Sequence, residues 1–369
     1  MGNPLLEIRA LGQSIWLDNI SRQLLDTGKL AQLITEDGIS GVTSNPTIFE
    51  KAIGHSDLYD RAISAAAHDG LDARAIFFKV AYADIREGAD LLRPAYDDAD
   101  GRDGHISFEL PPELAHDAAG SIEAGKRIKT EIDRENVLIK VPATQEGVEA
   151  FRELTATGVS VNVTLLFAVE RYEEIANAWI EGLERRVAAG EPVDRLASVA
   201  SVFVSRVDGK VDARLEELGH SELQGIAAVA NAKLAYRSFQ RIFSGPRWEA
   251  LAAKGAHVQR PLWASTSVKN PAYPDTLYVD TLIGPDTVNT MPEVTIDAVR
   301  DHGHPARTID QKVDAAAAHM AELERLGVDL DRILKHELVV EGVESFQKSF
   351  DSLITTIAEK ARELAPARA

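Results

Sequence analysis

Eight short runs of β-branched and other apolar residues alternate with longer amphipathic segments, and this alternation limits the fold more than any other feature of the chain. Apolar residues spaced three and four apart predict helices between the runs. Strands that alternate with helices pair in parallel through right-handed crossovers. The expected strands are 14–18, 41–45, 105–110, 137–141, 160–167, 198–205, 260–266 and 287–292. The clearest expected helices are 19–37, 72–92, 112–134, 168–189, 222–243 and 342–364.

Two α/β architectures satisfy this order: an open doubly wound sheet and a closed (β/α)₈ barrel. The open sheet usually carries a glycine-rich nucleotide-binding turn after an early strand, and the sequence contains neither G-x-G-x-x-G nor G-x-x-x-x-G-K-[ST]. We therefore predict a (β/α)₈ TIM barrel that forms a single domain over residues 1–369. The long interval after the second strand predicts extra helices at about 50–100. A C-terminal helical extension is expected at about 305–366.

Composition narrows the classes of function and partner. The chain has no cysteine, which excludes disulfides, thiolate metal sites and a cysteine nucleophile. With 58 acidic and 40 basic residues, its formal net charge is -18. Such a surface repels nucleic acid and anionic lipid, so we expect neither nucleic acid nor a membrane as a partner. The N-terminal segment lacks the features of a signal peptide, and we expect a cytoplasmic protein.

Polar residues recur near the C-terminal ends of the expected strands, on one face. Side chains two residues apart share a face of a strand, and active sites of (β/α)₈ barrels lie at this end of the strands. Any one such residue could be a structural hydrogen-bond partner, but the repeated pattern indicates a site. The pairs are Trp16 with Asp18, Thr43 with Asn45, Ser107 with Glu109, Leu138 with Lys140, Asn162 with Thr164, Ser201 with Phe203, and Trp263 with Ser265.

Lys140 is the most informative of these residues, because it stands inside the apolar run 137–141. A lysine has an ordinary pKa of ~10.4, and burial can lower a lysine pKa by ~3–5 units. A neutral amine can attack a carbonyl to form a Schiff base, which serves as an electron sink for cleavage of a carbon–carbon bond. Glu109 and Asp18 could then accept and donate protons. A buried ion pair between Lys140 and either carboxylate explains the same residues, and both interpretations stay open at this point.

The sequence resembles the transaldolases at these positions. "GVTSNPTIF" (41–49) and "LIKVPATQEGVEA" (138–150) are similar to two long signatures of that family. The similarity continues through "WLDNISRQLL", "SVNVTLLF", "SVFVSRVD", "RPLWASTSVKNPAYPDTLYV" and "TVNTMPEVT", and so covers nearly the whole chain. It looks closest to the longer bacterial branch, which has a tryptophan in the seventh strand.

The resemblance implies a transferase of the non-oxidative pentose phosphate pathway that needs neither a metal nor an organic cofactor. It would move a dihydroxyacetone unit from sedoheptulose 7-phosphate to glyceraldehyde 3-phosphate. Lys140 would be the Schiff-base nucleophile. Glu109 would act as acid and base through a water held by Thr164, and Asp18 would deprotonate a substrate hydroxyl.

The resemblance also implies a set of substrate-binding residues. Asn45 and Asn162 would bind hydroxyls, and Arg206, with Ser201, would bind the phosphate. The arginine that the family usually has in the seventh strand is missing here, where "ASTSVKN" offers Ser265, Ser267 and Lys269 instead. Lys269 could replace it, although a plain surface lysine fits equally well. Thr43 and Phe203 complete the expected set.

Two alternatives remain. One is a related lyase that releases free dihydroxyacetone, and the other is a barrel that binds sugar phosphates without turning them over. We expect small-molecule sugar phosphates as ligands and a monomer or homodimer. The C-terminal helices could form a lid over the barrel mouth, and Pro111 and Pro112 should end the third strand.

Overall fold

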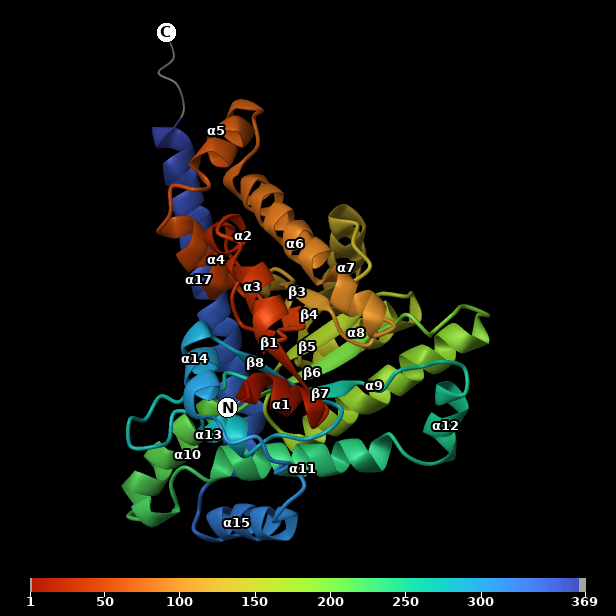
Figure 1. Cartoon of the computed structure of the whole chain (residues 1–369), viewed down its shortest axis with the longest axis vertical. Coiled ribbons are helices and arrows are strands. Elements are labelled where there is room, and N and C mark those ends of the chain that lie inside the picture. Colours follow the sequence, from red (N-terminus) through yellow and green to blue (C-terminus); the bar gives the residue numbers. More distant parts are fainter. Residues whose placement is uncertain (1, 365–369) are drawn as a thin grey trace.

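The computed structural model describes residues 2–364, and in this part of the chain eight parallel strands form a closed barrel in the order β1 to β8 (Figure 1). Five register partners between β1 and β8 close the cylinder. This confirms the predicted fold class, with a strand in each of the eight expected places. The strands are β1 Gln13–Leu17, β2 Gly41–Val42, β3 His105–Glu109, β4 Val137–Pro142, β5 Val161–Leu166, β6 Ser198–Phe203, β7 Arg260–Ala264 and β8 Thr287–Met291.

Helices surround the barrel, and the apolar strand positions that face outward pack against them. All six residues of β4 are buried, as expected for a strand that has covered faces on both sides. The outer layer is itself well packed, since Phe151 of α8 and Trp179 of α9 stack with ring centroids 6.1 Å apart. The helices that follow strands β3 to β8 are α7 Ala118–Ile132, α8 Gln145–Ala156, α9 Val169–Ala188, α10 Ser205–Leu218, α11 Ala227–Ile242, α12 Pro246–Ala252, α13 Leu277–Asp280 and α14 Glu293–His302.

Additional helices lie where the length of the chain predicts them. Between β2 and β3 are α4 Pro46–Gly54, α5 Asp60–His68 and α6 Ala73–Asp98, and α15 Val313–Arg325 comes after α14. The chain then forms α16 Leu330–Arg332, the π-helical turn η3 Ile333–Glu337 and the long helix α17 Leu338–Glu363. Residues 365 and 366 of the expected extension lie outside the described residues.

Helix α17 runs beside α4, α5 and α6 and crosses the C-terminal end of β5 (Figure 1). Gly342 permits this crossing, because a Cβ atom at that position would lie 2.7 Å from Leu165 Cδ2. Thr47 of α4 and Ser349 of α17 share a hydrogen bond of 2.8 Å. Near the far end of the helix, Lys360 forms an ion pair of 2.8 Å with Asp60.

Several expected boundaries differ from the structure. The segment 19–37 forms two helices, α2 Arg22–Asp26 and α3 Lys29–Glu36, because Gly28 between them has a φ of 70°. The segment 112–134 starts with the short turn η1 Pro112–Leu114, so α7 begins only at Ala118. Similarly, η2 Ser221–Leu223 precedes α11. The chain begins with α1 Pro4–Ala10.

Strand β2 is shorter than expected, since its ladder ends at Val42. Asn45 instead caps α4: its side-chain oxygen accepts a hydrogen bond from the backbone N–H of Ile48, and Pro46 occupies the first helical turn. Strand β3 ends at Glu109, just before the two prolines, as predicted. No helix within residues 2–364 combines the length and the apolar character needed to cross a membrane.

Candidate active site

Lys140 and Glu109 meet at the C-terminal end of the barrel. They are register partners on neighbouring strands β4 and β3, which places both side chains on the same side of the sheet. Lys140 Nζ lies 3.1 Å from Glu109 Oε2, and the two side chains are only 5% and 7% exposed. Lys140 also donates a hydrogen bond of 3.1 Å to the backbone oxygen of Ser44. The ion pair that the sequence left open therefore exists.

Asp18 follows directly after β1 and is fixed from the neighbouring strands. Thr43 donates a hydrogen bond of 2.6 Å to Asp18 Oδ1, and the Thr43 hydroxyl is also 2.7 Å from that of Thr290 at the end of β8. The backbone N–H of Asp18 donates to the carbonyl oxygen of Met291. Asp18 therefore has a defined position at the edge of the mouth.

Burial raises the pKa of both carboxyl groups above their ordinary values. For Glu109, the positive charge of Lys140 opposes the effect of burial and the negative charge of Asp18 adds to it. For Asp18, the hydrogen bond from Thr43 and the charges of Lys140 and Lys269 oppose it. Two carboxyl groups of increased basicity thus accompany one lysine, an arrangement suited to proton transfer at a carbonyl carbon.

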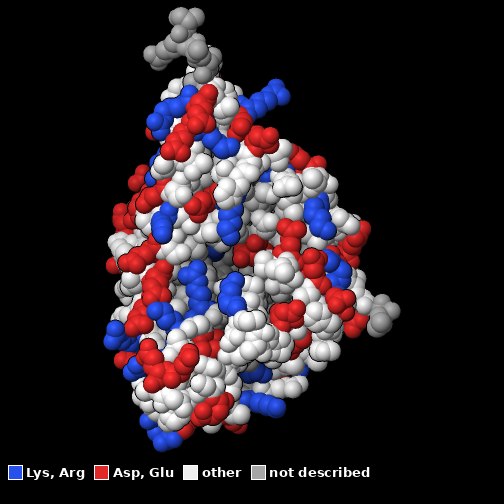
Figure 2. Space-filling view, turned by 90° about the vertical axis from the view of Figure 1, so that its left-hand side faces the viewer, with Lys and Arg blue, Asp and Glu red and all other residues white. Residues whose placement is uncertain are grey.

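These residues surround a cavity of about 330 Å³. All the residues predicted for the site line it except Asn162 and Glu109, and Glu109 contacts the lining residue Lys140. The lining predicted residues are Asp18, Thr43, Asn45, Lys140, Thr164, Ser201, Phe203, Arg206, Ser265 and Lys269. Figure 2 shows the face on the left of Figure 1, where Lys and Arg side chains border a central hollow on a surface otherwise rich in Asp and Glu.

Asn162 is fully buried and is held by hydroxyl groups of β3, which lies across the barrel interior, and of the adjacent strand β6. Its Nδ2 donates a hydrogen bond of 3.0 Å to Ser107 Oγ, and its Oδ1 accepts one of 2.7 Å from Ser201 Oγ. Thr164, two residues further along β5, lines the cavity, and its hydroxyl has no hydrogen-bond partner within residues 2–364.

Arg206 stands in the first turn of α10, between two phenylalanine rings. Its Cζ lies 5.3 Å from the ring centroid of Phe203 and 5.9 Å from that of Phe346. Burial lowers the pKa of Arg206, and the nearby charge of Glu109 acts in the opposite direction. Phe346 belongs to α17, and its centroid is also 5.8 Å from Lys140 Nζ. The C-terminal helix therefore covers part of the barrel mouth.

The seventh strand departs from the predicted pattern. Leu262 is the register partner of Ser201, whose hydroxyl points into the barrel, so Leu262 and not Trp263 faces inward. Trp263 points away from the cavity, and its Nε1 donates to the backbone oxygen of Leu282. The prediction that Trp263 shares a face with Ser265 was wrong, because Ser265 has a φ of 56° and breaks the alternation.

Lys269 is exposed at the rim of the cavity, where its Nζ donates a hydrogen bond of 2.6 Å to Ser267. Lys51, Thr290 and Phe346 are among the lining residues that were not predicted. Alternation along β8 would have identified Thr290. Lys51 and Phe346 lie on helices, and no sequence pattern indicates which helical residues reach the mouth.

A larger cavity, of about 690 Å³, lies at the opposite end of the barrel. We place the chemistry in the smaller one, because Lys140 and Asp18 line it and Glu109 contacts Lys140 beside it. No group of three or more His, Asp or Glu side chains within residues 2–364 is arranged to hold a metal ion.

Comparison with known proteins adds independent evidence. Residues 15–357 match the family model described as transaldolase/fructose-6-phosphate aldolase. The chain is 49% identical to a protein named transaldolase from Acidothermus cellulolyticus, over 98% of this chain and 99% of that protein. It is 47% identical to the transaldolase of Frankia alni, over 98% of each chain. For the transaldolase of Trichodesmium erythraeum the identity is 44%, over 99% of each chain.

Proposed function

The chain belongs to the transaldolase/fructose-6-phosphate aldolase family, and we propose that it is a transaldolase that works through a Schiff base on Lys140. The reaction transfers a dihydroxyacetone unit from sedoheptulose 7-phosphate to glyceraldehyde 3-phosphate. It yields erythrose 4-phosphate and fructose 6-phosphate. The observation that carries the proposal is the contact of 3.1 Å between Lys140 and Glu109 in the mouth cavity.

The sequence left open whether Lys140 is a Schiff-base nucleophile or a member of a buried ion pair, and we infer that it is both. A buried carboxylate with a raised pKa is a suitable acceptor for a proton of the adjacent ammonium group. When the proton passes from Lys140 to Glu109, both groups become neutral and the amine becomes a nucleophile. The ion pair is thus the resting form of the nucleophile, and its two members exchange one proton.

The amine then attacks the carbonyl carbon of the ketose phosphate, and the resulting carbinolamine loses water to form the iminium ion. We assign the proton transfers of this step to Glu109, acting through a water bound by Thr164. The unpartnered hydroxyl of Thr164 supports the assignment. Glu109 Oε2 is also free of any aligned hydrogen bond within residues 2–364, since its contact with Lys140 has the distance but not the angles of one.

Carbon–carbon cleavage needs a base at the hydroxyl next to the bond that breaks. We assign this step to Asp18, whose Oδ1 is fixed by Thr43 and whose pKa is raised by burial. The hydroxyl proton passes to Asp18 as the aldehyde departs, and the bonding electrons move into the iminium. The same carboxyl group returns the proton when the acceptor aldehyde adds.

The phosphate requires positive charge at the cavity. Arg206, Lys269 and Lys51 supply it around the opening, and the hydroxyls of Ser265 and Ser201 add donors. Thr43, Asn45 and Phe203 line the same cavity, and we assign to them the substrate contacts that remain. Asn162 contacts a substrate only if its amide exchanges Ser107 or Ser201 for a substrate hydroxyl.

All these residues come from one chain, so a single subunit suffices for the proposed chemistry. We retain the expectation of a monomer or homodimer with sugar phosphates as substrates, acting in the cytoplasm.

The direct test is an assay of sedoheptulose 7-phosphate with and without glyceraldehyde 3-phosphate. We expect turnover only with the acceptor present, and none above background for Lys140→Met. Rapid release of free dihydroxyacetone without an acceptor would favour the related lyase. Binding of sugar phosphate without any turnover would favour a non-catalytic barrel.

A further inference from the structure

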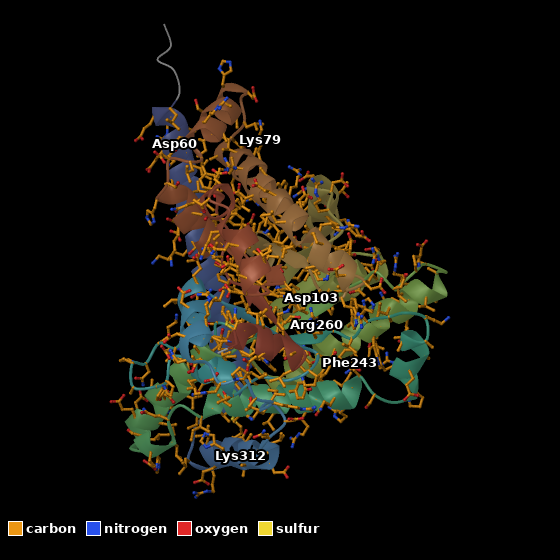
Figure 3. All side chains as sticks on the ribbon, in the orientation of Figure 1. Asp60, Lys79, Asp103, Phe243, Arg260 and Lys312 are labelled. Atoms are coloured by element: carbon orange, nitrogen blue, oxygen red, sulfur yellow. The ribbon has the colours of Figure 1, made fainter. Side chains whose placement is uncertain are left out.

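The large cavity at the N-terminal end of the strands has no part in the proposed reaction. Its volume of about 690 Å³ is more than twice that of the mouth cavity, which is about 330 Å³, and falls within the usual range of small-molecule sites. Residues of α1, β1, β3, β7 and α12 line it, together with the loops that enter β3, β6, β7 and β8. Figure 3 shows Asp103 and Arg260 of this cavity close together in the middle of the molecule, far from Lys312 on one side and Asp60 on the other.

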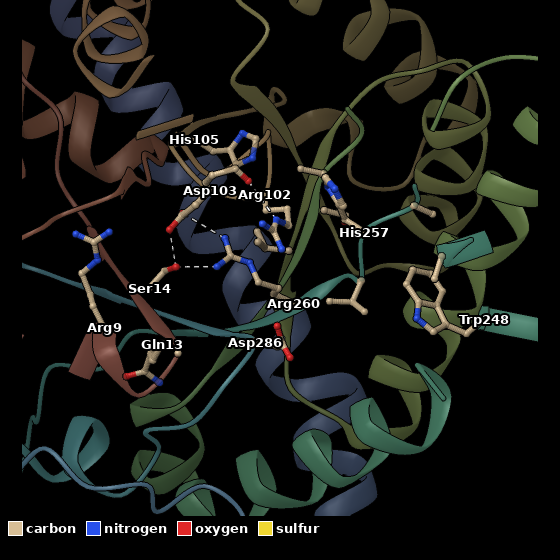
Figure 4. A pocket seen from close by; sticks show the side chains of 18 residues that line it. Arg9, Gln13, Ser14, Arg102, Asp103, His105, Trp248, His257, Arg260 and Asp286 are labelled. Carbon is tan, nitrogen blue, oxygen red and sulfur yellow. Dashed lines mark hydrogen bonds and ion pairs between the residues drawn. The ribbon is translucent and has the colours of Figure 1, made fainter. Parts of the chain in front are cut away.

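The floor of the cavity is a fixed network. Arg260 donates a hydrogen bond of 2.7 Å to Ser14 Oγ and forms an ion pair of 3.2 Å with Asp103 (Figure 4). Asp103 also accepts hydrogen bonds from Ser14 and from Trp16 Nε1, at 2.6 and 2.9 Å. The carboxylate of Asp103 thus has three partners, and the side chains of Arg260 and Asp103 remain 13% and 14% exposed.

Three arginines, Arg9, Arg102 and Arg260, and two aspartates, Asp103 and Asp286, line the cavity, which leaves a formal excess of one positive charge. Arg9 and Arg102 line the cavity, and neither forms an ion pair within residues 2–364. Burial lowers the pKa of His257; the charges of Arg102 and Arg260 add to this effect, and those of Asp100 and Asp194 oppose it. Like charges placed together repel, and an anion between them removes the repulsion. In a chain of net charge -18 this local excess points to an anionic ligand.

The remaining wall is apolar. Trp248 and Ala252 of α12, with Ala256 and Val258 after it, line the side that faces away from α1. In Figure 4, Trp248 lies across the cavity from Arg9 and Ser14, with His257 and Arg260 between them. A ligand that fills the cavity therefore needs a charged end and a flat apolar body.

We propose that this cavity binds a nucleoside monophosphate, with its phosphate on Arg102 and Arg260 and its base against the wall that includes Trp248. A guanidinium group binds a phosphate through paired, charge-assisted hydrogen bonds. The site lies at the end of the barrel opposite to Lys140. Binding is measured without turnover, so the outcome is independent of the function proposed above.

The test is calorimetric titration of the full chain with adenosine monophosphate, ribose 5-phosphate and inorganic phosphate at constant ionic strength. We expect a 1:1 complex with adenosine monophosphate, with a Kd below about 1 mM, and weaker binding of the other two anions. Arg102→Ala should weaken this complex about ten-fold or more. Arg102→Lys, which keeps the positive charge, should lose less affinity for adenosine monophosphate.

Two variants locate the ligand. Arg325→Ala removes an exposed arginine of α15 and should leave binding unchanged, whereas Arg206→Ala tests binding at the barrel mouth. Lack of binding to the wild type, unchanged binding by Arg102→Ala, or loss of binding in Arg206→Ala would each overturn the proposal. Equal affinity for inorganic phosphate would also overturn it, because the apolar wall would then contribute nothing.

Discussion

At the scale of single residues, the proposed chemistry depends on three side chains at the barrel mouth. Lys140 and Glu109 are buried together, and Asp18 is positioned by Thr43. The sequence predicted that these side chains converge. Side chains alternate along a strand, and active sites of (β/α)₈ barrels lie at the C-terminal ends of the strands. The sequence allowed an ion pair of Lys140 with either carboxylate but could not decide between them, since the choice of Glu109 depends on the register of β3 against β4.

Replacing Glu109 by glutamine should slow the formation of the Schiff base. Glutamine has a similar shape but cannot take the proton of Lys140, so we expect kcat to fall by about 10²–10⁴-fold. Steady-state assays with sedoheptulose 7-phosphate measure the loss. Glu113→Gln, an exposed neighbour in η1, is the matched control and should retain wild-type activity. Wild-type kcat in Glu109→Gln would remove this carboxyl group from the mechanism.

Replacing Asp18 by asparagine should block cleavage after the Schiff base has formed. We expect kcat to fall by about 10²–10⁴-fold, while borohydride still traps substrate on Lys140. The wild type should lose kcat as the pH falls through the pKa of Asp18, because the base must be unprotonated. Since burial raises that pKa, the loss should occur above the ordinary value of ~3.9. A wild-type kcat in the Asp18→Asn variant would contradict the assignment of Asp18 as the base.

At the scale of elements, the sequence predicted the strands of the barrel but not which helix covers its mouth. The eight strands and their order followed from hydrophobic patterning. The inward face of β7 did not, because the positive φ of Ser265 interrupts the alternation. The covering of the mouth by α17 depends on tertiary packing of Phe346, and amphipathic spacing alone cannot identify the surface that a helix covers.

Phe346 should keep the reaction intermediate away from water. Phe346→Ala opens the mouth beside Lys140 and Arg206, so we expect a larger share of free dihydroxyacetone relative to transfer product. Product analysis with and without the acceptor measures this ratio. Phe346→Leu should change this ratio less than Phe346→Ala does. Leu353→Ala, a buried position further along α17, controls for general weakening of the helix, and an equal ratio in both alanine variants would refute this role.

Asp208 connects α10 to its neighbours and should make stability depend on pH. It accepts hydrogen bonds from Ala228 N and from the hydroxyl of Tyr278, and burial raises its pKa to about 6. Because this value is above the ordinary ~3.9, the folded state binds the proton more tightly than the unfolded state. The stabilisation is complete below pH ~4 and is lost as the pH rises through about 6.

Thermal unfolding at pH 5, 6 and 7 tests this linkage. The Tm of the wild type should fall with rising pH relative to that of Asp208→Asn, which has no proton to lose. The difference between the two proteins should therefore change across this interval. Parallel Tm curves for wild type and variant would show that Asp208 does not titrate there.

At the scale of the whole molecule, one barrel carries two cavities at opposite ends of the same strands. The mouth holds the lysine and its carboxylates, and the opposite end holds the Arg260–Asp103 network. The sequence predicted the first cavity through strand ends. The second was not predicted, because it combines residues at the N-terminal ends of strands with residues of α1, of α12 and of the entering loops. The excess of acidic residues outside the mouth makes its cluster of Lys51, Arg206 and Lys269 a local exception suited to phosphate.

The most direct measurement is borohydride reduction of the protein in the presence of fructose 6-phosphate, followed by peptide mass mapping. We predict a reduced three-carbon adduct on the peptide that contains Lys140, and no adduct in Lys140→Met. An unmodified Lys140 peptide, or the same adduct on another lysine, would contradict the account.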